Sequence, residues 1–171
     1  AFAANFDPAQ TYAIETNHGY HVLYTRDWLP TLARTYDILH DVIPPSRRAR
    51  IGEWLAQMVQ VIERPAVWQR WKHTTHGAWQ ATALATVGAA LGNDAMTKLA
   101  ATRTRYQLST LVGPDGIWPG GSLRFHYTAT RAFLAFAEAT IAGGSGAYGW
   151  AGPDGMRYIR RRIDGPLGCV D

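Results

Sequence analysis

Histidines gather at three places in this sequence, beside neighbours suited to acid–base chemistry or to binding an anion. Five of the six histidines belong to these groups: His18 with His21, His73 with His76, and His126 alone. His18 and His76 each precede a glycine, which lets a ligand approach the backbone closely. Because imidazole titrates near neutral pH, these histidines are candidates for proton transfer. A hydrogen-bonded structural role is the alternative for each of them.

A second group of polar residues follows a glycine-rich turn, in the run Gly-Gly-Ser-Leu-Arg124-Phe-His126-Tyr127. An arginine can hold a carboxylate through paired hydrogen bonds. A nearby positive charge favours the phenolate form of a tyrosine, so Tyr127 is a candidate acid or base. Trp118, just before this turn, is either the wall of a cleft or an anchor for the loop.

The spacing of the histidines also permits a metal site. His18 with His21 and His73 with His76 are each three residues apart, so each pair can present two imidazoles to one ion. Asp27 or Asp115 would add an oxygen ligand. This pattern defines an alternative hypothesis, a metal-dependent hydrolase.

The elements that position these residues are helices. Apolar residues recur at spacings of three and four through most of the chain, whereas no strand pattern of any length occurs. Pro30 indicates a kink or a helix start near residues 27–28, and Ser46 is the expected N-cap of the helix that follows. The sequence predicts an all-α single domain over residues 1–171, with five or six helices in antiparallel hairpins. The expected helices lie at about 13–43, 47–62, 76–91, 94–111, 125–142 and 156–163.

The composition excludes several classes of protein. With 47% hydrophobic and 18% charged residues the chain is globular and not disordered. No apolar run reaches the roughly 20 residues that span a bilayer, so we expect no membrane partner. The net charge of +4 suits an acidic polysaccharide, whereas no nucleic-acid-binding motif accompanies the basic cluster at residues 157–162. The single cysteine, Cys169, excludes a disulfide framework.

A short repeat links the two halves of the chain. Asn17-His18-Gly and Thr75-His76-Gly each place His-Gly at an expected helix start, 58 positions apart. This spacing suits a repeated two-helix unit, as in a helical array or toroid.

The order of these motifs resembles the alginate-lyase-like polysaccharide lyases. The shared order is His-Gly-x-Trp79, an apolar helix, Gly-Asn-Asp, a second helix, Asp-Gly, and then Gly-Ser-x-Arg-x-His-Tyr before another apolar helix. It covers roughly residues 29–142, and Arg34-Thr-Tyr-Asp-Ile-Leu39 is similar to the family's helix leading into the catalytic region. The resemblance implies part of an (α/α) toroid and β-elimination on a uronic-acid polysaccharide, in the periplasm or secreted.

The resemblance also implies a role for each candidate residue. His76 and Tyr127 would be the catalytic pair that transfers protons, and Arg124 and His126 would neutralise the substrate carboxylate. Trp79 and Trp118 would line the sugar cleft, and His73, His18 and Asn17 would bind substrate. No metal or other cofactor is required if arginine supplies the positive charge.

Two departures from the family pattern leave an alternative open. Thr75 stands where these lyases carry an asparagine, for which Asn17 of the sister motif would have to substitute. The chain has the length of about half a toroid, so we expect a fragment, a processed piece, or a small protein that pairs with a second copy or a complementary chain. Both departures favour the alternative of a non-catalytic helical module that binds an acidic glycan or a protein.

Overall fold

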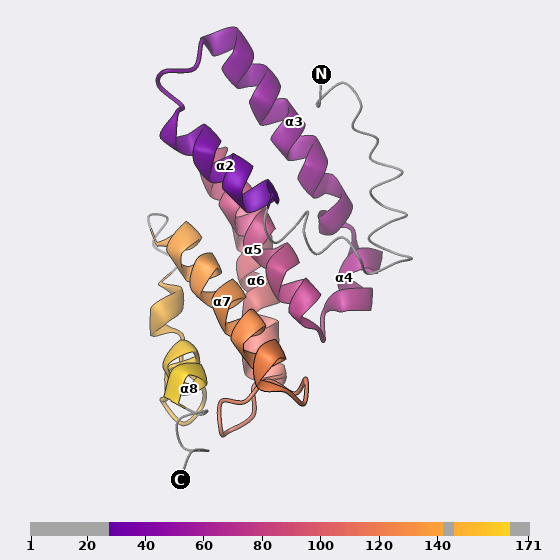
Figure 1. The fold of residues 1–171 in the computed structure, drawn as a ribbon, viewed down its shortest axis with the longest axis vertical. Coiled ribbons are helices and arrows are strands. Elements are labelled where there is room, and N and C mark those ends of the chain that lie inside the picture. The colour runs from indigo at the N-terminus through magenta and orange to yellow at the C-terminus, as the bar shows by residue number, and fades with distance from the viewer. Residues whose placement is uncertain (1–27, 142–145, 165–171) are drawn as a thin grey trace.

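The computed structural model describes residues 28–141 and 146–164 and consists of helices (Figure 1). The described part contains no strand, and its one β-bridge joins Ala151 to Arg157. The prediction of an all-α fold is therefore confirmed. The helices are α2 (Leu29–Ile38), α3 (Pro45–Glu63), α4 (Pro65–Trp71), α5 (Thr75–Ala90), α6 (Asp94–Thr110), α7 (Leu123–Thr140), the 3₁₀ turn η3 (Ala147–Gly149) and α8 (Tyr158–Asp164).

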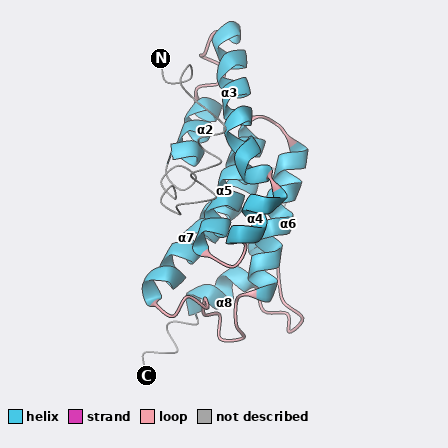
Figure 2. Cartoon of the chain, turned by 90° about the vertical axis from the view of Figure 1, so that its right-hand side faces the viewer, coloured by secondary structure: helices cyan, strands magenta, loops and turns pink. Residues whose placement is uncertain are grey.

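Helix α5 is the centre of the described fold. It is buried almost all round, as expected for a helix whose alanine-rich surface has no polar face. In Figures 1 and 2, α2 and α7 lie on one side of α5 and α6 lies on the opposite side. Helices α5 and α6 form an antiparallel hairpin, and α7 then runs in the same direction as α5.

Local sequence explains where these helices begin and end. Gly92 has a positive φ of 62° after the end of α5, a conformation that favours glycine. Asn93 then caps α6, since its side chain accepts a hydrogen bond from the Met96 amide at 3.1 Å. Ser122 caps α7 in the same way through the Phe125 amide at 3.3 Å.

Three local expectations need correction. Helix α3 begins at Pro45 and not after Ser46, because proline supplies a helical φ in the first turn without a side-chain cap. Residues 65–71 lie outside the helices expected from the sequence but form α4, which also begins on a proline. Helix α2 ends at Ile38, so the apolar pattern continues into a turn before Pro44. The expected helical residues 13–27 lie outside the described part.

Side chains from distant helices hold the bundle together. Buried Arg103 of α6 donates hydrogen bonds to the carbonyl oxygens of Ile62 and Glu63, the latter at 2.7 Å, at the end of α3. Those carbonyls lack partners within their own helix, so the guanidinium satisfies them and complements the helix dipole. Burial lowers the pKa of Arg103 to about 10. No helix in the described part is long and apolar enough to cross a membrane.

Candidate active site

The first turns of α5 and α7 lie at the same end of the bundle. The two helices run in parallel side by side, and Thr82 of α5 donates a hydrogen bond to the Ala132 carbonyl of α7 at 2.9 Å (Figure 1). His76 precedes Thr82 by six residues and Tyr127 precedes Ala132 by five. At about 1.5 Å of rise per residue, the Cα atoms of Tyr127 and His76 therefore lie roughly 7.5 and 9 Å along their axes from this contact. The two predicted catalytic residues are at the same level of the bundle.

His76 is partly buried at the start of α5. Its ring stacks on Trp71 of α4, with centroids 4.8 Å apart and an interplanar angle of 21°. Thr75, in the position where the resemblance implies an asparagine, is only 7% exposed. Its side chain is therefore packed inside the protein and does not take the place of a substrate-binding amide.

Tyr127 is open to solvent on α7. Its side chain is 64% exposed, and the guanidinium of Arg131 lies over the ring at 5.8 Å from the centroid. These residues are four apart, which places them on neighbouring turns of one helix face. Arg124 is also exposed, on the first turn of α7.

His126 occupies a buried position, 6% exposed, between α7, α8 and the preceding loop. Its Nδ1 accepts a hydrogen bond from the Trp118 amide at 3.3 Å, and its Nε2 donates to the Arg162 carbonyl at 2.8 Å. Burial, followed by the charge of Arg162, lowers the pKa of His126, so the neutral ring is favoured. Both ring nitrogens are used within the protein, which leaves neither for a substrate carboxylate in this geometry.

Buried Arg162 completes this arrangement from α8. Its guanidinium donates to the His126 carbonyl and to Thr130 Oγ1, each at 3.0 Å, and lies over the rings of Trp118 and Phe133. Burial lowers its pKa to about 10. The basic cluster expected at residues 157–162 is thus divided, because Arg162 is inside while Arg157 and Arg160 are exposed.

The tryptophans differ in their surroundings. Trp118 is 3% exposed and packs on Phe133 at 5.9 Å between centroids, which favours the loop-anchor alternative over the cleft wall. Trp79 is 5% exposed and lines a hollow of about 380 Å³ between α2, α5 and α7. Arg34 and Arg131 line the same hollow. Sequence reasoning missed Arg131, although its spacing of four from Tyr127 was a usable signal.

His73 forms a separate pair on the surface. Its Nε2 shares a hydrogen bond of 2.8 Å with the Tyr106 hydroxyl, and the two rings stack. His73 and His76 therefore contact different aromatic partners. In the described part of the chain, no three His, Cys, Asp or Glu side chains gather in a metal-binding arrangement. Asn17, His18, His21 and Asp27 lie outside the described residues.

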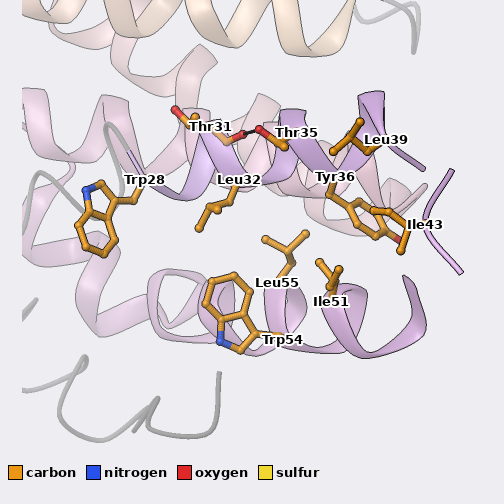
Figure 3. Close-up of a pocket in the computed structure, with 10 residues that line it drawn as sticks. All are labelled: Trp28, Thr31, Leu32, Thr35, Tyr36, Leu39, Ile43, Ile51, Trp54 and Leu55. Carbon is orange, nitrogen blue, oxygen red and sulfur yellow. Dashed lines mark hydrogen bonds between the residues drawn. The ribbon is translucent and has the colours of Figure 1, made fainter. Parts of the chain in front are cut away.

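A further hollow is unsuited to an acidic polymer. About 660 Å³ in volume, it lies between α2 and α3, and Figure 3 shows its walls of aromatic and aliphatic side chains. Its polar lining is limited to Thr31, Thr35 and the polar atoms of Trp28, Tyr36 and Trp54. No charged residue lines it, so the groove of Trp79, Arg34 and Arg131 is the better candidate for a substrate carboxylate.

Comparison with known proteins gives one finding. A family model described as Alginate lyase matches residues 7–160, which is most of the chain. No curated protein and no solved structure gives a significant match.

Proposed function

We propose a lyase reaction for this chain, which belongs to the alginate lyase family: it cleaves an acidic, uronic-acid polysaccharide by β-elimination. Membership of the family supports the reaction class and the acidic substrate. The observation that carries the residue assignment is the common level of His76 and Tyr127 at one end of the paired helices α5 and α7.

The reaction requires three catalytic contributions from the protein: charge neutralisation, a base and an acid. The substrate carboxylate must be neutralised, because its charge opposes loss of the neighbouring C5 proton. A base then takes that proton, its electron pair forms the C4–C5 double bond, and the C4–O bond breaks. An acid finally protonates the departing glycosidic oxygen. The products are one shorter chain with a free hydroxyl and one with an unsaturated uronate end.

His76 and Tyr127 are proposed as the two proton-transfer groups. Tyr127 is exposed to an incoming polymer, and the guanidinium of Arg131 lies over its ring. The stack on Trp71 fixes the plane of the His76 imidazole. Arg124, exposed on the first turn of α7, supplies positive charge near the same end.

His126 and Trp118 are proposed to position other residues of the site and not to contact the substrate. The hydrogen bonds of His126 hold the Trp118 loop and α8 against the start of α7. They thereby fix the turn that carries Arg124 and Tyr127. A secreted or periplasmic location is proposed as well, since a polymeric substrate would be met outside the cytoplasm.

The test follows the ultraviolet absorbance of the unsaturated uronate during incubation with alginate, glucuronan, hyaluronan and heparan-type chains. We expect Tyr127→Phe and His76→Ala each to lower kcat by about 10²-fold or more, the range for loss of a general acid or base. Tyr36→Phe and His40→Ala are the matched controls, and they should keep the wild-type rate. Full activity in Tyr127→Phe would refute the assignment.

A non-catalytic module that binds acidic glycans is the second candidate. The buried side chain of Thr75 favours it, because no amide is offered at this position of α5. Binding of uronate oligomers by the wild-type chain, with no rise in absorbance for any polymer, would establish this second candidate.

A further inference from the structure

A groove runs along the bundle between α2 and α7, with α5 as its floor. It consists of two hollows, of about 380 and 520 Å³, which share Arg34. The first hollow is lined by Trp79 and Thr82 of α5, Arg34 of α2 and Arg131 of α7. Side chains from three helices therefore converge on one concave surface, the kind of place where a ligand contacts several elements at once.

The first hollow is positively charged. Arg34 and Arg131 are both exposed, and neither has an acidic partner within 4 Å in the described part of the chain. The lining of this first hollow includes no acidic residue. Two guanidinium groups across a hollow of this size can both donate hydrogen bonds to one carboxylate.

The first hollow lies near the two residues proposed for proton transfer. Arg131 lies over the ring of Tyr127, and Trp79 follows His76 by three residues on α5. The lining residues Arg131 and Trp79 are thus about one helical turn along their helices from Tyr127 and His76, respectively. His126, to which the sequence assigned this contact, has both ring nitrogens bonded inside the protein.

We propose that Arg34 and Arg131 bind the carboxylate of an acidic sugar in the groove between α2 and α7. This inference rests on the proposed lyase function, for which the two arginines supply the neutralising charge. Arg131 touches the substrate beside Tyr127, and Arg34 holds the same carboxylate from the opposite wall.

The second hollow limits the binding site. It contains Asp37 and Glu138 besides Arg34, and Glu138 accepts a hydrogen bond from the Tyr148 hydroxyl. Two carboxylates repel an acidic chain, so the polymer occupies the Trp79 end of the groove and is turned away at the Glu138 end. The charge pattern of the groove therefore selects a short stretch of substrate.

The experiment combines binding with cleavage for Arg34→Gln, Arg131→Gln and the control Arg50→Gln, an exposed arginine on α3. Calorimetry measures the Kd of oligomers of the four polymers and of their carboxyl-reduced forms, and the absorbance assay gives kcat and KM. We expect both groove variants to weaken binding of the acidic oligomers about tenfold. Arg131→Gln should also lower kcat, and Arg131→Lys should restore part of the loss because it keeps the charge.

The outcomes separate this inference from the proposed function. Cleavage by the wild type with unchanged Kd and KM in both groove variants would overturn the inference and leave the lyase function standing. A second outcome is that the wild type binds acidic oligomers but cleaves none, and that this binding is lost in both groove variants and absent for carboxyl-reduced oligomers. This outcome would support the inference and overturn the lyase function. An absence of binding to every oligomer would refute both.

Discussion

Two glycines inside helices are expected to respond to alanine in opposite ways. A Cβ atom at Gly77 of α5 would lie 2.5 Å from the Trp71 carbonyl oxygen and 2.8 Å from Nε2 of Gln107. A Cβ atom at Gly52 of α3 would lie no closer than 3.4 Å to any neighbour, with Leu91 and Tyr36 in ordinary contact. Gly77→Ala therefore overpacks the junction of α4, α5 and α6, whereas Gly52→Ala fits the existing space.

The magnitude at Gly77 combines three effects. Alanine gains up to about 1 kcal/mol of helix propensity over glycine. Overpacking against a backbone oxygen costs about 1–3 kcal/mol. Displacement of Gln107 weakens its hydrogen bonds to the carbonyls of Lys72 and Thr74, worth about 1 kcal/mol each. We expect a net loss of about 2–3 kcal/mol, against a gain of up to about 1 kcal/mol for Gly52→Ala.

Urea unfolding of the two variants measures this difference as a change in midpoint at constant slope. In a thermal scan, Gly77→Ala should lower Tm by roughly 5–10 °C for a chain of this size. Because the displaced turn carries Trp71 and its stack on His76, lyase activity should fall as well. Equal stability of both variants, or a stabilised Gly77→Ala, would refute the packing argument.

Two further predictions concern stability. The lowered pKa of His126 means that, as pH falls below about 6.5, the unfolded chain binds a proton that the folded protein does not, so stability declines through the folded pKa. His126→Gln should remove this pH dependence from the free energy of unfolding, and an unchanged pH dependence in this variant would contradict the assignment. Asn93→Ala should cost about 1 kcal/mol in the same assay because α6 loses its N-cap, and an unchanged midpoint would contradict the capping role.

Much of the helical framework was predictable from sequence because helices are set by local patterns. The three-and-four spacing of apolar residues and the run Gly92-Asn93-Asp94 predict α5, α6 and the turn between them close to their observed bounds. Proline was harder to interpret, since Pro45 begins α3 ahead of the expected cap Ser46, and Pro65 begins a helix that the sequence pattern did not predict.

The candidate site was predicted only in part. The structure places His76 and Tyr127 at one level, but the sequence did not reveal that Arg131 lies over Tyr127 or that Arg34 shares its hollow with Trp79. Helix periodicity groups residues on a face without saying which other helix that face meets. Arg34 and Arg131 come together only because α2 and α7 both pack on α5.

By itself, then, the sequence determined the all-α framework, the turn between α5 and α6, and the set of residue types suited to an acidic sugar. Tertiary structure decided which of those residues are exposed to a substrate and which are buried. His126 is buried where it hydrogen-bonds to the carbonyl of Arg162, 36 positions later in the chain. Trp118 is buried beside it, under the Arg162 guanidinium. The physical reason is that helix formation depends on neighbours a few residues apart, whereas burial and hydrogen-bond partners depend on helices brought together from distant parts of the chain.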